Sequence, residues 1–359
     1  IFTLHGVTDA EGIKQSFAER KAQDVTIVGG GLIGIEMAEA FHNLGARVTI
    51  VERLPQILSF LDEEMAALVT NHLEAKGVKV RTNTTVTAFS GNGHVEKVIT
   101  DKGEIPSDIV IMAVGVRPTV SLAKSAGIEL GSTGAIKVSE KMQTSDPSIF
   151  AAGDCVEVVN RVTGKHCYMP LGSTANKQGR VAANTICGKE DRFPGVLNTA
   201  ICKVFDYAVA TTGLSEKEAR KEGYDILAVL SPAPDRAHFY PSAKPIMMKL
   251  IVDKESHRLL GAQIIGPGDV DRRIDIAVTA VTGEMTVPTV TLSGGTLGCS
   301  GSLTVTQSMT WTGGILGGWQ SIGISEQAIL TISGPDAKEV IESPWLTNTG
   351  TVSWTGGDI

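Results

Sequence analysis

Three glycines, Gly29, Gly31 and Gly34, form a Gly-x-Gly-x-x-Gly pattern, the spacing in this sequence that points most directly to chemistry. The pattern follows a short apolar run, Val25–Val28, and precedes a stretch with apolar residues at helical spacing, 32–44. In that context Gly29 permits a tight turn, Gly31 lets backbone approach a pyrophosphate, and Gly34 lets the helix pack closely on a sheet. The free amides and positive dipole end of the helix then favour the phosphates of a dinucleotide.

Glu52 ends the next apolar run, where this pattern expects an acidic residue. A carboxylate there accepts hydrogen bonds from the adenosine ribose and repels a 2′-phosphate, so NAD(H) is predicted rather than NADP(H). The cation Arg53 would partly offset that repulsion. Ile33, inside the glycine pattern, and Gly115, at the end of a later apolar run, are further predicted cofactor contacts.

Glu36 lies in the first turns of the helix that the glycine pattern opens. It is either a solvated acid stabilised by the helix dipole or a carboxylate that faces the nicotinamide. The second interpretation makes it the one candidate catalytic residue. The alternative for the whole pattern is a glycine-rich turn that binds no ligand.

Buried strands are predicted at 25–28, 48–51, 78–80 and 109–114, with helices at 32–44 and 62–76 between them. Alternating strands and helices indicate an α/β fold with a doubly wound parallel sheet, here a Rossmann-like NAD(H)-binding domain over 1–115. Residues 84–108 alternate polar and apolar side chains around a Gly-Asn-Gly turn, which predicts an antiparallel hairpin insertion.

An α+β unit is predicted downstream, with strands at 203–211, 226–231, 246–253 and 260–265 and helices at 215–223 and 271–282. Charged residues nearly vanish after Pro288, and all four tryptophans lie beyond it. The segment Thr291–Gly294 recurs at Thr331–Gly334, and Trp311–Gly314 recurs at Trp354–Gly357. This recurrence predicts a β-solenoid or similar array with a period near 40 residues over the tail, 289–359.

The bulk composition excludes several functions. A net charge of -7 argues against a nucleic-acid or anionic-membrane partner. No apolar run reaches the roughly 18 residues of a membrane-spanning helix. The five cysteines lack metal-ligand or CxxC spacing, so we expect reduced structural thiols, no metal site and a cytoplasmic location.

The sequence resembles the pyridine nucleotide–disulfide oxidoreductases, in particular the branch of coenzyme A disulfide reductases, NADH oxidases and NADH peroxidases. The resemblance spans residues 1 to about 287 in the order of that family. The matching stretches are Val28–Glu36, Ala113–Pro118, Ile149–Asp154, Pro170–Arg180, Thr212–Ser215 and Leu260–Gln263.

The resemblance implies the C-terminal part of an FAD-binding domain at 116–190. Asp154 would contact the sugar–phosphate part of the flavin, although it could instead cap a helix. Further implied flavin contacts are Leu171, Ala175 and Asn176. Phe60 resembles an aromatic residue beside the NAD adenine, and core packing explains it equally well.

A truncated dimerisation domain is implied at 191–288, so the parent enzyme is expected to be a homodimer. His238 and Tyr240 resemble residues near the partner's active site, although each could be an ordinary packed or surface residue. In the family, an FAD-adenosine motif and a redox cysteine lie upstream of the NAD domain, and we expect both to be missing here. The tail is expected to be foreign.

The resemblance therefore implies an FAD-dependent oxidoreductase that moves hydride from NADH to FAD and on to a disulfide, a sulfenate or oxygen. Without the upstream motif and thiol, this chain is expected to turn over poorly. The rival hypothesis is a secreted β-repeat surface protein in which the tail is the functional part.

Overall fold

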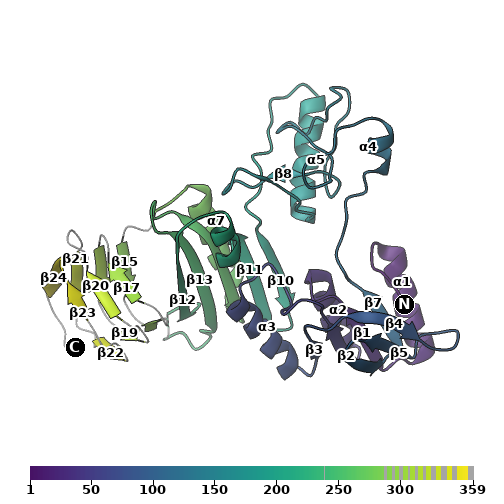
Figure 1. Cartoon of the computed structure of the whole chain (residues 1–359), viewed down its shortest axis with the longest axis horizontal. Coiled ribbons are helices and arrows are strands. Elements are labelled where there is room, and N and C mark those ends of the chain that lie inside the picture. Colours follow the sequence, from purple (N-terminus) through teal and green to yellow (C-terminus); the bar gives the residue numbers. More distant parts are fainter. Residues whose placement is uncertain are drawn as a thin grey trace. The chain divides into compact units, whose positions relative to one another are not determined.

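The computed structural model of the chain (Figure 1) describes residues 1–237 and 239–286, the strands between 289 and 354, and residues 349–350. The chain divides into two compact units, Ile1–Phe205 and Asp206–Ile359. The two units are described in turn.

The first unit is built on a parallel sheet with the strand order β3-β2-β1-β7. Its strands bury β-branched side chains: Ile27, Ile50 and Ile111 are fully buried, as expected for strands covered on both faces. This arrangement confirms the predicted doubly wound fold. The elements of this part are α1 (Val7–Arg20), β1 (Asp24–Val28), α2 (Leu32–Asn43), β2 (Arg47–Val51), α3 (Glu63–Ala75), β3 (Lys79–Arg81) and β7 (Ile109–Met112).

The insertion after β3 has three strands, where the sequence predicted a hairpin of two. They are β4 (Val86–Ser90), β5 (Lys97–Thr100) and β6 (Gly103–Pro106), paired antiparallel in that order. The second turn depends on Gly103, whose φ is +116°, and on Thr100, whose hydroxyl donates to the carbonyl of Gly103 at 2.7 Å.

Residues after β7 form a smaller part of the first unit with few regular elements. Its core gathers Met142, Val156, Val158, Val181 and Phe193. Helix α5 contributes Val181 to this core, and the neighbouring loops cover it. The elements are α4 (Ser121–Ser125), β8 (Val158–Val159), β9 (His166–Cys167), α5 (Gly172–Ile186) and β10 (Ala200–Val204).

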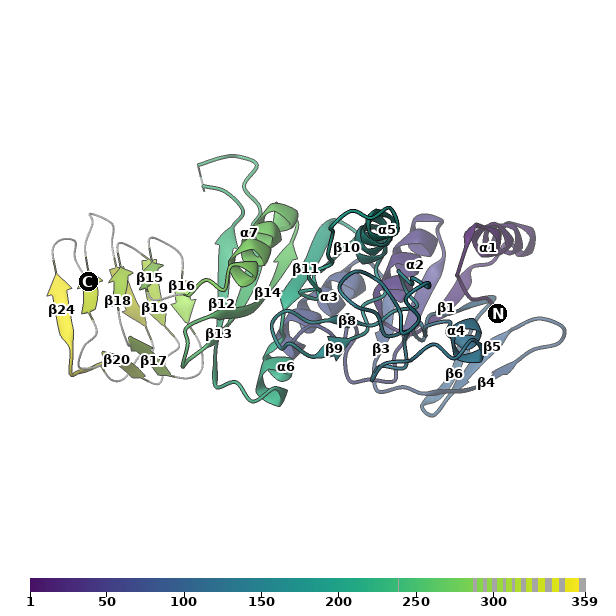
Figure 2. The same ribbon diagram turned by 90° about the horizontal axis from the view of Figure 1, so that it is seen from above.

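In the second unit, four antiparallel strands are neighbours in the order β11-β14-β13-β12. Helix α7 packs on one face, where Ile274 meets Ile246 and Ile264, and Figure 2 shows it lying over these strands. The elements are β11 (Tyr207–Gly213), α6 (Glu216–Lys221), β12 (Ile226–Pro234), β13 (Pro245–Asp253), β14 (Leu259–Gly266) and α7 (Val270–Thr282).

The predicted single strand at 203–211 is wrong in one respect. Strand β10 ends at Val204 and β11 begins at Tyr207, with a turn between them. Phe205 occupies this turn with a φ of +55°, a left-handed conformation that an aromatic residue rarely adopts. The continuous apolar pattern concealed the break.

The described strands of the tail form three parallel sheets, and consecutive strands along the chain belong to the first, second and third sheet in turn. The sheets are β15-β18-β21-β24, β16-β19-β22 and β17-β20-β23. Parallel pairing of this kind has the form of a β-solenoid, and the repeat array stays a prediction. The first-sheet strands begin at 289, 308, 329 and 351, so one turn takes 19 to 22 residues and the period seen in the sequence is two turns. The bounds are β15 (Thr289–Leu292), β16 (Thr296–Gly298), β17 (Ser302–Val305), β18 (Ser308–Trp311), β19 (Gly314–Gly317), β20 (Ser321–Ile324), β21 (Ile329–Ile332), β22 (Lys338–Ile341), β23 (Leu346–Asn348) and β24 (Thr351–Trp354).

The strand register explains the longer period. Leu292 pairs with Trp311, Trp311 with Ile332, and Ile332 with Trp354, so tryptophan alternates with an aliphatic residue along one column. A residue type that returns on every second turn produces an apparent repeat twice as long. Several parts of the predicted repeat units lie outside the described residues, namely Ser293–Gly294, Thr312–Gly313, Ser333–Gly334 and Thr355–Gly357, whereas Gly314 begins β19.

A buried ion pair joins β13 to α6 in the second unit. Lys249 is 2% exposed, and its Nζ lies 2.8 Å from Oε2 of Glu216. Burial by itself would raise the pKa of the Glu216 carboxyl, but hydrogen bonds from Lys249 and Arg220 outweigh it and hold the pKa below its ordinary value. The Glu216 carboxyl therefore stays ionised at neutral pH.

We expect Glu216→Gln to destabilise the second unit by about 2 kcal/mol, because it leaves a buried ammonium without its carboxylate. Urea denaturation at neutral pH measures the change. The matched control is Asp225→Asn, which breaks the equally short but exposed pair with Lys254 and should cost under about 0.5 kcal/mol. Equal losses in both variants would contradict the argument.

Candidate functional site

The three patterned glycines lie in the loop from β1 to α2 and in the first turn of α2. They differ in whether the surrounding atoms leave room for a side chain. A Cβ on Gly29, whose φ is +110°, would lie 2.2 Å from the carbonyl oxygen of Ala113. A Cβ on Gly34 would lie 2.0 Å from the carbonyl oxygen of Gly29. A Cβ on Gly31 would meet nothing within 4 Å. The two outer glycines are thus required by packing, whereas the space beside Gly31 is open to a ligand.

Helix α2 begins directly at this open space. Gly31 is its N-cap residue in an extended conformation, and no side chain caps the helix. The first turn holds no acidic residue that would offset the helix dipole. The unpaired amides of that turn and the positive end of the dipole therefore remain available to an anion.

Glu52 closes the glycine turn from the end of β2. Its Oε2 accepts a hydrogen bond from the amide of Gly30 at 2.7 Å, and its Oε1 accepts one from the amide of Leu54 at 2.8 Å. The sequence predicts an acid near the turn. It does not predict that both carboxylate oxygens bind backbone, which fixes the side chain and the turn together.

The other end of the Gly30 peptide is held by residues that sequence reasoning missed. The carbonyl oxygen of Gly30 accepts from the amide of Leu58 at 2.8 Å. Leu58 is buried and has a φ of +45°, and a Cβ on Gly30 would lie 2.6 Å from Cγ2 of Ile57. We call residues 54–61 the turn strap. Nothing in its sequence pattern marks it.

The remaining predicted nucleotide contacts lie around this turn with different exposures. Ile33, in the first turn of α2, is 37% exposed, and Phe60, in the turn strap, is half-buried. Gly115 follows β7 with a φ of +102°, and a Cβ there would meet nothing within 4 Å. Arg53 is exposed beside Glu52.

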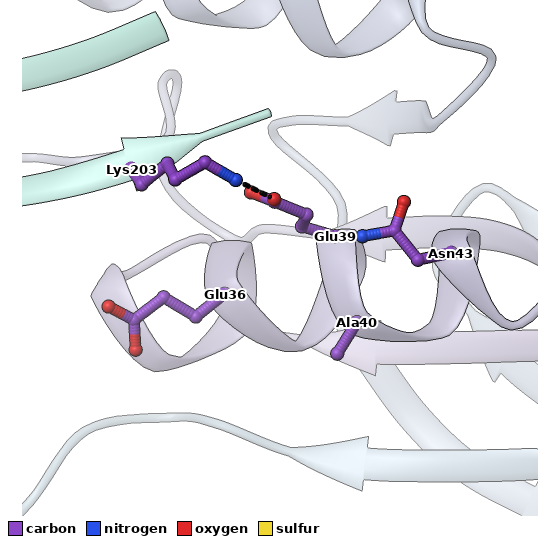
Figure 3. A pocket seen from close by; sticks show the side chains of 5 residues that line it. All are labelled: Glu36, Glu39, Ala40, Asn43 and Lys203. Atoms are coloured by element: carbon purple, nitrogen blue, oxygen red, sulfur yellow. Dashed lines mark hydrogen bonds and ion pairs between the residues drawn. The ribbon is translucent and has the colours of Figure 1, made fainter. Parts of the chain in front are cut away.

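Glu36 is exposed on α2 and lines a shallow hollow with Glu39, Ala40, Asn43 and Lys203 (Figure 3). In this hollow the Lys203 ammonium lies 2.5 Å from Oε1 of Glu39, and the amide of Phe205 donates to Oε2 of Glu39 at 2.7 Å. The side chain of Glu36 points away from this pair (Figure 3). Glu39 therefore anchors β10, a role that the sequence does not reveal. Glu36 takes no part in this interaction between Glu39 and β10.

The predicted flavin residues come together at the start of α5. Leu171 is the N-cap residue of that helix, and no side-chain hydrogen bond caps it. Gly153 has a φ of +87°, and a Cβ there would lie 3.6 Å from Cβ of Ala175. The turn that carries Asp154 therefore packs against the first turns of α5, close to Asn176 in sequence. Asp154 and Asn176 are both exposed.

These residues fit the group that the sequence resemblance implies. Among the described residues, no hydrogen bond or ion pair engages the exposed carboxylate of Asp154. It projects from a turn held against an uncapped helix start, an arrangement that presents one acceptor and several amide donors to a sugar–phosphate. An FAD at this place would find both kinds of partner.

Among the described thiols, Cys202 is disfavoured as a redox nucleophile. Cys155, Cys167, Cys187 and Cys202 are all free cysteines, and Cys299 lies outside the described residues. Burial, with a smaller contribution from the Glu36 carboxylate, raises the pKa of Cys202 to about 12. In the described part of the chain no cluster of His, Cys, Asp or Glu could hold a metal ion.

Tyr240 lies on the connection between β12 and β13, and its ring centroid is 4.6 Å from that of Phe239. Both rings are exposed. This connection is held by the buried Asp235, which accepts from Arg236 at 2.8 Å and from the amide of Lys244 at 2.8 Å. The other residue predicted here, His238, lies outside the described residues.

Two family models match this chain. The family model for pyridine nucleotide-disulphide oxidoreductase matches residues 1–179, and the model for the dimerisation domain of that family matches residues 199–294. The NAD(P)H sulfur oxidoreductase (CoA-dependent) of Pyrococcus abyssi is 43% identical over 288 residues, which are 80% of this chain and 64% of that protein. This chain thus spans less than two thirds of that relative.

Two solved structures share the fold. The NAD-dependent persulfide reductase from A. fulgidus is 45% identical with a TM-score of 0.78, and the match covers 80% of this chain and 53% of that one. A FAD-dependent pyridine nucleotide-disulphide oxidoreductase from Desulfovibrio vulgaris is 36% identical with a TM-score of 0.71, and the match covers 80% and 70%. In the described residues, none of the helices is long and apolar enough to cross a bilayer.

Two glycine variants should separate ligand binding from folding. We expect Gly31→Val to leave stability nearly unchanged, because its side chain meets open space, and to weaken NADH binding at least about tenfold by blocking the pyrophosphate. We expect Gly34→Ala to lower thermal stability, because its Cβ collides with the carbonyl of Gly29. Thermal melts and NADH fluorescence titrations measure the two effects. Unchanged NADH affinity in Gly31→Val would remove the turn from the site.

The Asp235 cluster should respond to acid. Hydrogen bonds, first from Arg236 and then from the amide of Lys244, lower the pKa of Asp235 from 3.8 to about 2. Its stabilising contribution is therefore complete above the ordinary pKa and is lost as the pH falls toward 2. We expect the stability advantage of the wild type over Asp235→Asn to shrink between about pH 4 and pH 2. Urea denaturation at several pH values tests this, and an advantage independent of pH would refute it.

Proposed function

This chain belongs to the pyridine nucleotide-disulphide oxidoreductase family, and from that premise we propose that it binds NADH at the glycine turn and FAD at the Asp154 turn. The proposed reaction is hydride transfer from NADH to FAD. The observation that carries the proposal is the hydrogen bond from the Gly30 amide to Glu52, which holds an acid against the glycine turn.

The NADH half rests on the first unit alone. The amides at the start of α2 would hold the pyrophosphate, with Gly31 allowing close approach. Glu52 keeps unused lone pairs after binding two amides, so it can still accept from the adenosine ribose hydroxyls. Phe60 would lie beside the adenine, while Ile33, Glu36 and Gly115 would lie toward the nicotinamide.

For the FAD half, Asp154 would accept hydrogen bonds from the sugar–phosphate part, and Leu171, Ala175 and Asn176 would line the ring. FAD supplies the redox chemistry when bound, and the protein supplies binding and orientation. The exposed carboxylate of Asp154 and the open start of α5 support this assignment.

The electron acceptor would be a disulfide, a sulfenate or oxygen. A CoA-dependent NAD(P)H sulfur oxidoreductase and a persulfide reductase among the relatives favour sulfur chemistry. The thiol of Cys202 is protonated and buried, so it is unsuited to act as the nucleophile. We place the protein in the cytoplasm as a homodimer, which the free cysteines and the matched dimerisation domain support.

The same proposal assigns the chain as an NAD(H)-binding domain at 1–115, an FAD-binding part at 116–190, a dimerisation domain at 191–288 and a solenoid tail at 289–359. The rival function, a secreted surface protein that works through the tail, gains no support from the matches, because the two family models fall within residues 1–294.

We expect the chain to bind NADH about tenfold or more tightly than NADPH, because the Glu52 carboxylate repels a 2′-phosphate. Glu52→Ala should remove this preference and also weaken NADH, since the Gly30 amide loses its acceptor. Nicotinamide fluorescence titration measures both affinities. The control is Glu63→Ala, which removes an exposed acid at the start of α3 and should change neither. Equal affinity of the wild type for the two nucleotides would defeat the assignment.

A further inference from the structure

A buried glutamine of α5 binds the turn that presents Asp154. Gln178 is 1% exposed, and its Oε1 accepts a hydrogen bond from the amide of Gly153 at 2.7 Å. Polar side chains are seldom buried without a partner, and here the partner is a single backbone amide next to the proposed flavin-binding carboxylate. The sequence motif Pro170–Arg180 contains Gln178 but does not assign it a role.

The same turn is held from a second direction. The hydroxyl of Tyr168 donates to the carbonyl oxygen of Asp154 at 2.8 Å. Two successive residues of the turn are thus fixed by side chains from different segments, one from α5 at an amide and one from the connection between β9 and α5 at a carbonyl. Gly153 has a φ of +87°, which glycine adopts without strain, so the two hydrogen bonds select one of the several backbone conformations that glycine allows.

Both ends of this hydrogen bond matter for the position of Asp154. Gln178 lies on the helix that carries Ala175 and Asn176, and Gly153 lies next to Asp154. The hydrogen bond therefore joins the two groups of predicted flavin contacts into one rigid arrangement. Loss of its acceptor would leave the Gly153 amide partly buried and unpaired, so the turn would rearrange to reach water or another acceptor.

We infer that Gln178 is a positioning residue for the flavin: its hydrogen bond to Gly153 sets the place of the Asp154 carboxylate relative to α5. This inference rests on the proposed function, in which Asp154 binds FAD. Gln178 acts through Gly153 and Asp154 rather than by contact with the reacting atoms.

The test compares Gln178→Met with Asn184→Leu in the full chain. Methionine keeps the length of the side chain and removes the acceptor. Asn184 lies on the same helix and donates to Asp191 at 2.8 Å, so its variant removes a similar amide hydrogen bond away from the turn. Tyr168→Phe is a milder second variant that loosens the turn from the other side. Its result decides the inference if Gln178→Met does not fold.

Three measurements apply to each protein: hydrogen exchange of the peptide that contains Gly153, FAD affinity from quenching of flavin fluorescence, and the visible absorption spectrum of the bound flavin. We expect Gln178→Met to speed exchange roughly tenfold, weaken FAD about tenfold and shift the flavin bands. Tyr168→Phe should act in the same direction with a smaller effect. Asn184→Leu should leave all three measurements at the wild-type values.

The outcomes separate the inference from the proposed function. A wild-type chain that binds no FAD overturns both. A wild-type chain that binds FAD, with Gln178→Met and Tyr168→Phe that bind it equally well and show the same spectrum, overturns the inference alone. If Asn184→Leu weakens FAD binding as much as Gln178→Met does, the inference is also overturned, because the effect would then be a general destabilisation of α5.

Discussion

The carboxylate of Glu52 bound to the amides of Gly30 and Leu54 is the constraint on which the proposed nucleotide site depends. A glycine-rich turn has many accessible backbone conformations, and fixing it costs about 1–2 kcal/mol of conformational entropy per residue. Glu52 fixes the turn at one face and Leu58 at the other, before any ligand binds. The amides at the start of α2 are thereby aimed at a common point, and ligand binding need not order them.

The same physical device recurs at the second proposed site. Glu52 lies 22 residues after the amide that it binds, and Gln178 lies 25 residues after Gly153. In both cases a side-chain oxygen from a later segment, at the end of β2 or on α5, holds one amide of a turn whose neighbouring residues are proposed to face a ligand. The turns carry the backbone groups that would bind a ligand. The side chains from the neighbouring strand or helix hold those turns in place.

The sequence predicts the parts of this architecture that follow from periodicity. Buried strands and the helices between them appear where the apolar pattern places them, and the three glycines occupy the packing environments expected from their spacing. Interactions that depend on backbone conformation could not be predicted. The left-handed φ of Leu58 and Phe205 leaves no trace in residue type, so the turn strap and the break between β10 and β11 were missed.

Periodicity also misled where two repeats overlap. The tail repeats every turn in structure but every second turn in sequence, because Trp311 and Trp354 are separated in their column by Ile332. Aliphatic and aromatic side chains can fill equivalent positions in a solenoid. A search for identical residues therefore finds a period longer than one structural turn. The roles of Glu39 and Gln178 likewise required coordinates, since an acid or amide on a helix is most often solvated.

Hydrogen exchange of the full chain, measured with and without NADH, tests the central claim most directly, because it reports on the backbone amides themselves. The account predicts that NADH slows exchange in the segments 29–35 and 52–58 more than anywhere else in the first unit. Slowing confined to other segments, with the glycine turn unchanged, would show that the nucleotide binds elsewhere and would contradict the account.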